Sequence, residues 1–213
     1  MIIDFHTHLA LQQPAGSGTQ LVSTSPDNFD PEPGVLYSIG IHPWDTALVT
    51  DAHLRLLELL AWHPQVVAIG ETGLDTLKGA HLDRQMEIFK FHVTIAEQVA
   101  KPLVIHAVHT SQQVIQAWKE SRQLVPWAIH GMRGNENVAR PFIDAGFYLS
   151  FGVRFNPKTV GITPLNRLLI ETDDAPVSIQ TVAAQVAETL GLSQQEIIDL
   201  ATQNATSILM RKF

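Results

Sequence analysis

The sequence predicts an α/β fold, a distorted TIM (βα)8-type barrel in which the first helix and the second strand are reduced. Short apolar runs recur along the 213 residues, helical patterns separate most of them, and a polar residue capable of chemistry follows most of the runs. Runs this short and apolar suit strands that are buried on both faces, as in a parallel sheet. Strands that alternate with helices indicate βα units. We expect one domain over residues 1–213, the default for this length.

Seven strand candidates are clear. The first is the apolar run of Ile2, Ile3 and Phe5, and the others are Leu36–Ile41, Val66–Ile69, Pro102–Ile105, Trp127–Ile129, Tyr148–Phe151 and Leu168–Ile170. An eighth candidate, Leu21–Thr24, is weaker, because it lies inside Gln12–Gly34, a tract rich in Gly, Pro, Ser and Gln. We interpret this tract as a long loop on the rim of the barrel.

Helical spacing of apolar residues predicts the segments between and after the strands. The expected helices are Asp51–Trp62, Leu82–Ala100, Thr110–Lys119, Glu136–Ala145, Val182–Leu190 and Gln194–Met210. We expect the last helix to be interrupted around Gln203-Asn204. Asn156–Leu165 holds two prolines and is predicted to be a loop.

Composition narrows the classes of function. The formal charge of −7 argues against a protein that coats nucleic acid by electrostatics, although it leaves open an enzyme that acts on phosphodiesters. The absence of cysteine excludes thiolate ligands, so any metal must bind nitrogen and oxygen. No apolar stretch is long enough to span a membrane and no signal peptide is visible, so we expect a cytoplasmic protein without an obligatory protein partner.

The residues that end the predicted strands carry the strongest functional signal. His6 and His8 are two positions apart on one strand, so their side chains point the same way. The C-terminal strand ends of a parallel barrel meet on one face, where the functional groups collect. Seven residues are predicted to meet there: His6, His8, His42, Glu71, His106, His130 and Asp173. Each one alone is more often structural, but together they form a nitrogen and oxygen ligand set for two cations with a shared carboxylate.

The chain resembles the TatD-like metal-dependent hydrolases, or TatD-related deoxyribonucleases, within the amidohydrolase-type barrels. The motifs that carry the resemblance are Asp4-x-His6-x-His8, Gly40-Ile41-His42-Pro43, Gly70-Glu71-Thr72-Gly73-Leu74-Asp75, Pro102-x-x-Ile105-His106, His130-Gly131-x-x-Gly134 and Glu171-Thr172-Asp173. They occur in family order and span nearly the whole chain.

The resemblance implies a role for each of these ligand candidates. His6, His8 and Asp173 would hold one divalent cation, His106 and His130 a second, and Glu71 would bridge both. The cations would be Zn, Mg or Mn, and they would activate a water that attacks phosphorus. Asp173 would also accept the proton of that water, which makes Asp173 and Glu71 the predicted catalytic residues.

Residues beside the ligands are predicted to contact the substrate or the ligands. His42 and Asp75 follow strands next to ligand positions. Where the family usually has an arginine, this chain has Val108, followed by His109. Arg133 and Arg154 are the remaining candidates for a phosphate contact.

The sequence leaves the substrate open. The leading hypothesis is a phosphodiesterase or deoxyribonuclease that acts on DNA or a small phosphodiester. The first alternative is hydrolysis of a small-molecule amide or lactone, because one activated water serves both reactions and the fold does not separate them. The second is a barrel that binds metal without catalysis, which intact ligand positions disfavour.

Overall fold

The computed structural model describes residues 2–8 and 19–210. These residues form two compact units. The terminal unit contains the described residues up to Val22 together with those from Ile129 onward, and the central unit contains residues 23–128. The expectation of one domain over residues 1–213 stays a prediction.

The strands of the described residues follow chain order in one sheet, from β1 to β8. Their bounds are β1 Ile3–Thr7, β2 Thr19–Thr24, β3 Leu36–Ile39, β4 Val66–Asp75, β5 Leu103–Val108, β6 Trp127–Ile129, β7 Tyr148–Phe151 and β8 Leu168–Ile170. The pairs β1–β2, β3–β4, β4–β5 and β7–β8 are parallel. In the terminal unit a parallel bridge also joins Thr7 to Asp173, so the segment after β8 lies beside β1. This strand order confirms the predicted α/β barrel class.

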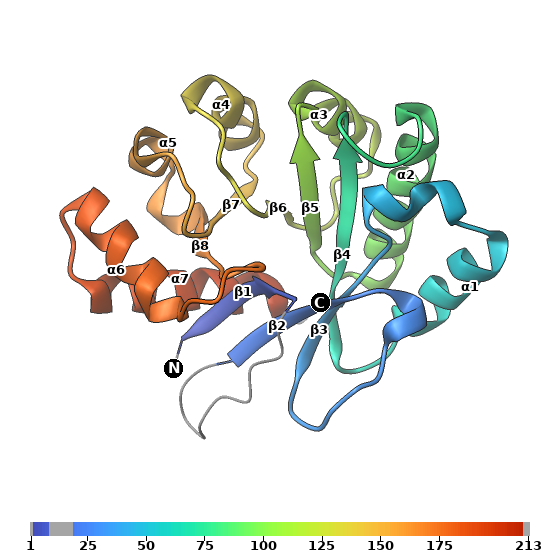
Figure 1. Ribbon diagram of the computed structural model, residues 1–213, viewed down its shortest axis with the longest axis horizontal. Helices are drawn as coiled ribbons and strands as arrows, with labels where there is room; N and C mark the ends of the chain where they lie inside the picture. The colour runs from blue at the N-terminus through green and yellow to red at the C-terminus, as the bar shows by residue number, and fades with distance from the viewer. Residues whose placement is uncertain (1, 9–18, 211–213) are drawn as a thin grey trace. The chain divides into compact units, whose positions relative to one another are not determined.

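Helices α1 to α5 each connect two consecutive strands, and α6 and α7 follow β8 (Figure 1). Their bounds are α1 Asp51–Leu60, α2 Leu82–Val99, α3 Ser111–Glu120, α4 Glu136–Asp144, α5 Pro157–Ile162, α6 Ile179–Leu190 and α7 Gln194–Leu209. Short 3-10 helices cover Pro26–Asn28, Pro43–Leu48 and Leu165–Arg167. Across the part of the chain that the structure describes, no helix has the length and apolar character to cross a membrane.

The core of the terminal unit is built on strands that are buried throughout. Every residue of β1, β7 and β8 is buried, as expected of short apolar strands covered on both faces. Helix α7 packs against β8 and β1, and its apolar residues Ile197 and Ile208 are buried. The strand ends that carry His6 and Asp173 are therefore anchored in a packed core.

Strand β4 of the central unit is longer than predicted. The sequence suggested a strand that ends at Ile69, but β4 continues to Asp75 and includes the whole Gly70–Asp75 motif. Glu71 and Asp75 are four residues apart and so lie on one face of the strand. Gly73 pairs with His106 on β5, and a Cβ atom at Gly73 would overlap the carbonyl oxygen of His106. This glycine allows the two backbones to approach and places His106 between the two carboxylates.

Two other element predictions were wrong. Asn156–Leu165 contains helix α5, because the Asn156 side chain accepts a hydrogen bond from Lys158 N at 3.0 Å and Pro157 is tolerated in the first turn. Helix α7 continues through Asn204 without interruption. The Asn204 side chain donates to the carbonyl oxygens of Leu165 and Leu168, at 2.7 and 2.8 Å, so this polar residue holds neighbouring chain rather than ending the helix.

Gln12–Gly34 was predicted to be a long loop, and this prediction was wrong for the strand candidate Leu21–Thr24. Strand β2 covers Thr19–Thr24, and its central residues Leu21 and Val22 are buried. The predicted reduction of the first helix falls on residues 9–18, which lie outside the described residues.

Candidate metal centre

The terminal unit brings together three of the predicted ligands. His6 lies on β1, His130 follows β6 and Asp173 follows β8, and each offers a ligand atom within 4.8 Å of the others. The Nε2 atoms of His6 and His8 are 4.0 and 3.7 Å from Oδ1 of Asp173. The rings of His6 and His130 lie with their centroids 4.2 Å apart. Two imidazoles and a carboxylate at this separation suit a divalent cation.

The backbone fixes Asp173 in this arrangement. Its N–H donates to the carbonyl of His6 at 2.9 Å, and its own carbonyl accepts from the N–H of His8 at 3.2 Å. The Thr7 hydroxyl donates to the same carbonyl at 3.2 Å. Asp173 has a φ of 56°, in the left-handed region that Asp tolerates better than most side chains. The end of β1 therefore determines where this carboxylate points.

A buried carboxylate, Glu171, lies beside the terminal-unit ligands. Its Oε1 accepts from Gly131 N at 2.6 Å and lies 3.5 Å from Nδ1 of His130. Burial by itself would raise the pKa of Glu171, but the contact with His130 and the charges of His130 and His6 together hold that pKa below its usual value. An ionised Glu171 can orient the His130 ring. Glu171 belongs to the Glu171-Thr172-Asp173 motif but no role was predicted for it; its place two residues before Asp173 is the signal that could have identified it.

Asp4 on β1 holds the segment after β8 that contains Thr172 and Asp173. Its carboxylate accepts from the backbone N–H and the hydroxyl of Thr172, at 2.9 and 2.6 Å. Burial raises the pKa of Asp4 to about 7 in spite of these two hydrogen bonds. Asp4 therefore ties β1 to the residue that precedes Asp173.

The central unit brings together His42, Glu71 and His106. Their ligand atoms also lie within 4.8 Å of one another. Oε1 of Glu71 lies 2.9 Å from Nε2 of His42 and 2.9 Å from Nδ1 of His106. Glu71 is almost fully buried, so both imidazoles meet it where little water reaches. These short distances allow direct hydrogen bonds between side chains.

The tautomer of His42 follows from its two partners. Its Nδ1 accepts a hydrogen bond from Trp44 N at 3.2 Å, so that nitrogen carries no proton. A neutral ring then has its proton on Nε2 and donates to Glu71. In this tautomer His42 can orient Glu71 through its Nε2 proton; its role beside the ligands stays a prediction.

Asp75 supports His106 from the other side of the ring. Its Oδ2 lies 3.1 Å from Nε2 of His106 and accepts from the indole N–H of Trp44 at 2.6 Å, while its Oδ1 accepts from Leu77 N. Partial burial opposes ionisation, but the hydrogen bonds from Trp44, Leu77 and His106 outweigh it and lower the pKa of Asp75. Trp44 was not predicted as a site residue, because no periodicity or motif distinguished it.

Helix α2 fixes the segment that precedes His42. His92 is fully buried, its Nε2 accepts from Ile41 N at 2.9 Å, and its Nδ1 lies 2.7 Å from the carbonyl oxygen of Ile88. Burial lowers the pKa of His92 to about 4, with only partial compensation from the Ile88 carbonyl. A neutral His92 therefore holds the end of β3 in place.

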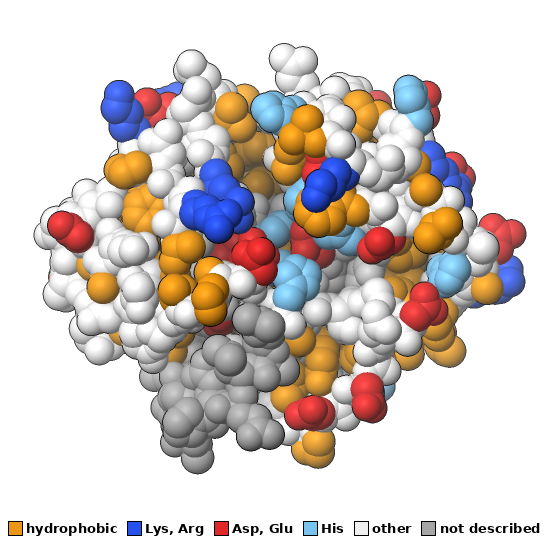
Figure 2. All heavy atoms as spheres, in the orientation of Figure 1, with side chains coloured by type: hydrophobic (Ala, Val, Ile, Leu, Met, Phe, Trp, Pro, Cys, Tyr) orange, Lys and Arg blue, Asp and Glu red, His pale blue; other side chains and the backbone are white. Residues whose placement is uncertain are grey.

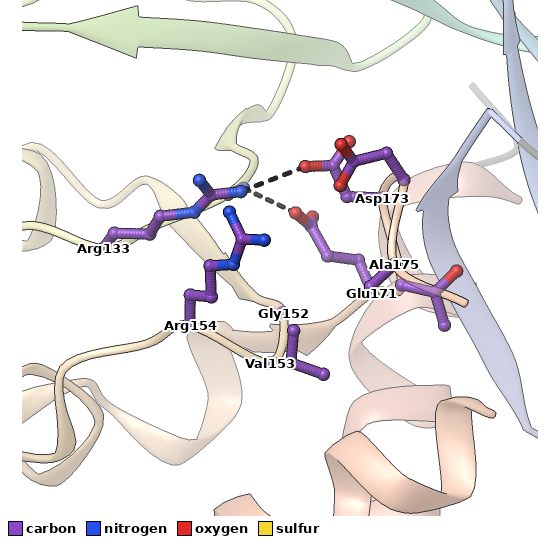
Figure 3. A pocket seen from close by; sticks show the side chains of 10 residues that line it. Arg133, Gly152, Val153, Arg154, Glu171, Asp173 and Ala175 are labelled. Carbon is purple, nitrogen blue, oxygen red and sulfur yellow. Dashed lines mark hydrogen bonds and ion pairs between the residues drawn. The ribbon is translucent and has the colours of Figure 1, made fainter. Parts of the chain in front are cut away.

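The remaining predicted contact residues are exposed. Oδ2 of Asp173 forms an ion pair with Nη2 of Arg133 at 3.3 Å, whereas Arg154 and His109 form no hydrogen bond or ion pair with any other described residue. Arg133, Arg154 and Asp173 line one pocket of the terminal unit (Figure 3). Where Figure 1 places β7 and β8, basic side chains lie beside acidic ones on the face in Figure 2. That all six predicted ligands form one centre stays a prediction.

Comparison with known proteins identifies the family. The profile described as TatD related DNase matches residues 27–210. The chain belongs to this family. The resemblance read from the motifs is confirmed, although His6 and His8 lie outside the matched range.

Individual TatD-family relatives agree with this assignment. The uncharacterized metal-dependent hydrolase YabD of Bacillus subtilis is 34% identical over 194 residues, which cover 79% of this chain and 74% of the relative. A 3′-5′ ssDNA/RNA exonuclease TatD of Klebsiella pneumoniae is 27% identical over 151 residues, 66% of this chain and 57% of the relative. The crystal structure of YJJV, a TatD homolog from Escherichia coli K12, has a TM-score of 0.83 and 22% identity, and covers 99% of this chain and 98% of that one. This last likeness supports the barrel fold.

The residues of this TatD-family chain fit divalent cations. The terminal unit presents the imidazoles of His6 and His130 with the Asp173 carboxylate, and the central unit presents the His106 imidazole with the Glu71 carboxylate. In each unit these ligand atoms lie within 4.8 Å of one another. Imidazole with carboxylate suits Zn and Mn, and the carboxylates also suit Mg. The donor chemistry therefore does not select one metal.

Proposed function

We propose that this TatD-family chain is a metal-dependent phosphodiesterase whose substrate is DNA or a smaller phosphodiester. The observation that carries the proposal is that ligand atoms of His6, His130 and Asp173 gather in the terminal unit and those of Glu71 and His106 in the central unit. Two supports come from relatives: one is named a metal-dependent hydrolase and another an exonuclease of single-stranded DNA and RNA.

Six residues would hold two divalent cations: His6, His8, Glu71, His106, His130 and Asp173. Glu71 would bridge both ions. When bound, such cations supply Lewis acidity, which favours ionisation of water and offsets negative charge on a phosphate.

Asp173 would both bind and take up a proton. Its Oδ1 faces the imidazoles of His6 and His8, and its Oδ2 faces outward to Arg133. One oxygen can thus serve as a ligand while the other accepts the proton of the attacking water. The hydrogen bonds of its backbone to His6 and His8 keep the carboxylate in this position.

His42 and Asp75 would set the orientation of the central-unit ligands. The Nε2 proton of His42 directs Oε1 of Glu71, and Asp75 fixes the ring of His106 between two carboxylates. Partners of this kind typically change metal affinity or activity by about 10–100-fold when they are replaced.

The test is a substrate screen on purified protein that has been stripped of metal and then supplied with Zn, Mg or Mn. We expect hydrolysis of bis(p-nitrophenyl) phosphate and of single-stranded DNA with at least one metal, and loss of both activities on chelation. Lactones and amides belong in the same screen. Turnover of those substrates without turnover of any diester would overturn the proposal in favour of amidohydrolase-type chemistry.

A further inference from the structure

Two arginines of the terminal unit follow neighbouring strands and reach one pocket. Arg133 lies after β6 and Arg154 lies after β7, and Met132 N donates to Ser150 O where these segments run together. The pocket that they line is also bounded by Gly131, Gly152 and the segment from Glu171 to Ala175. Both guanidinium groups extend toward the acidic segment after β8 (Figure 3).

Most N–H donors of these two guanidinium groups have no hydrogen-bond acceptor among the described residues. Arg154 has no hydrogen bond or ion pair within the described residues, and Arg133 has one ion pair, to Asp173. Half of the Arg133 side chain is exposed. An ion pair this exposed contributes little stability, so Arg133 can exchange its partner at small cost.

The chain has a formal charge of −7, yet two arginines lie together in this pocket. Two neighbouring positive charges suit an anionic ligand. A guanidinium presents several N–H donors in a plane and binds phosphate in a bidentate manner. Asp173, the predicted proton acceptor, lies on the wall of the same pocket. A phosphate held there would therefore lie next to the reacting group.

We infer that Arg133 and Arg154 form a binding site for a second phosphate of a nucleic acid strand, beside the phosphate that is cleaved. Arg133 exchanges Asp173 for this phosphate when the strand binds. The cleavage of the bound strand rests on the proposed function, whereas binding of the phosphate by the two arginines does not. It predicts preference for an oligonucleotide over a diester that carries a single phosphate.

Binding is measured first, by fluorescence anisotropy of a dye-labelled short single-stranded DNA in the presence of a chelator and at low salt. We expect Arg133→Gln and Arg154→Gln each to weaken binding about tenfold, equivalent to roughly 1.4 kcal/mol. The slope of log affinity against log salt concentration should fall by roughly 0.7 for each arginine that is lost. Arg140→Gln, on the exposed surface of α4, removes the same charge outside the pocket and should change binding by less than about twofold.

Activity is measured second, on the metal-loaded protein. The two pocket variants should lose about tenfold in kcat/KM on the oligonucleotide and less than about twofold on bis(p-nitrophenyl) phosphate. Equal affinity and equal kcat/KM on the oligonucleotide in wild type and both pocket variants would overturn the inference, as would an equal loss in Arg140→Gln.

The two proposals fail in different ways. If DNA binding depends on the arginines but no diester is cleaved with any metal, the phosphate site stands and the proposed reaction falls. If both diesters are cleaved and the pocket variants match wild type, the reaction stands and the phosphate site falls.

Discussion

The ligand sets of the two units are held by different means. In the terminal unit the imidazole nitrogens lie 3.7 and 4.0 Å from Asp173, and backbone hydrogen bonds between His6, His8 and Asp173 fix the carboxylate. In the central unit His42 and His106 contact Glu71 directly, each at 2.9 Å. The terminal set is held by backbone and the central set by its own side chains.

The two sets therefore differ in what must change when a cation binds. The terminal ligands are separated by about the span of an ion and keep their places through the backbone. In the central unit Oε1 of Glu71 already accepts a hydrogen bond from His42, and this bond competes with a cation for the same oxygen. Cation binding through Oε1 must therefore rearrange the contact with His42. Substitutions should therefore act on chemistry in the terminal unit and on metal affinity in the central unit.

The largest effect is expected for Asp173→Asn. This change keeps the shape of the side chain but removes a charged ligand and the predicted proton acceptor, so kcat should fall by about 10²–10⁴-fold at saturating metal. Steady-state kinetics on a diester, with metal content measured on the same samples, test this expectation.

Asp144→Asn, on the exposed end of α4, is the matched control and should retain wild-type kcat. If Asp173→Asn recovered full activity when the metal concentration was raised, Asp173 would be a ligand without a role as proton acceptor.

The next effect concerns the pH dependence of the central unit. The pKa of His92 is lowered from 6.5 to about 4 by burial. Above pH 6.5 His92 is neutral in both states, and below it the unfolded chain binds a proton that the folded chain does not. The free energy of unfolding should therefore fall as the pH drops from 6.5 to 4, by about 3 kcal/mol in total.

Urea unfolding at pH 7 and pH 5 measures this loss. The drop should be clearly smaller in His92→Gln, whose side chain does not titrate, whereas His109→Gln, at an exposed position, should lose as much as wild type. The same drop in all three proteins would place the effect elsewhere.

The sequence predicted features that depend on neighbouring residues better than features that depend on the packing of distant segments. Alternation along β1 was enough to place His6 and His8 on one face, and apolar run length was enough to find β7 and β8. The extension of β4 to Asp75 was missed, because Gly70 and Gly73 read as loop signals until the close approach of β5 explains them.

Side-chain partners that are distant in sequence could not be predicted from the sequence. The bond from Trp44 to Asp75 and the support of Ile41 by His92 depend on how three segments pack together. Helix α5 was missed for the opposite reason: prolines were read as breakers where Pro157 occupies the first turn. Pattern predicted which residues end the strands, and packing decides which groups orient them.

A smaller effect is expected for Asp75→Asn in the central unit. This change weakens the support of His106, so metal affinity should fall by about 10–100-fold.

Glu71→Gln should lower metal affinity more than Asp75→Asn does, because Glu71 is the proposed bridging ligand. Competition with a chelating dye measures both, and Asp83→Asn on the exposed start of α2 is the control. Metal content of Glu71→Gln equal to wild type would refute the bridge.

The smallest effect compares the helix starts of the two units. Helix α7 begins with a reciprocal pair in which the Ser193 hydroxyl accepts from Glu196 N at 3.2 Å and Glu196 accepts from Ser193 N at 2.7 Å. Helix α1 replaces the glutamate with His53, whose Nδ1 accepts from Thr50 N at 3.0 Å. We expect Ser193→Ala to lower the free energy of unfolding by about 1 kcal/mol and Thr50→Ala by about 0.5 kcal/mol. Urea unfolding of both variants measures the difference, and a larger loss at Thr50 would show that the histidine-based pair is the stronger of the two.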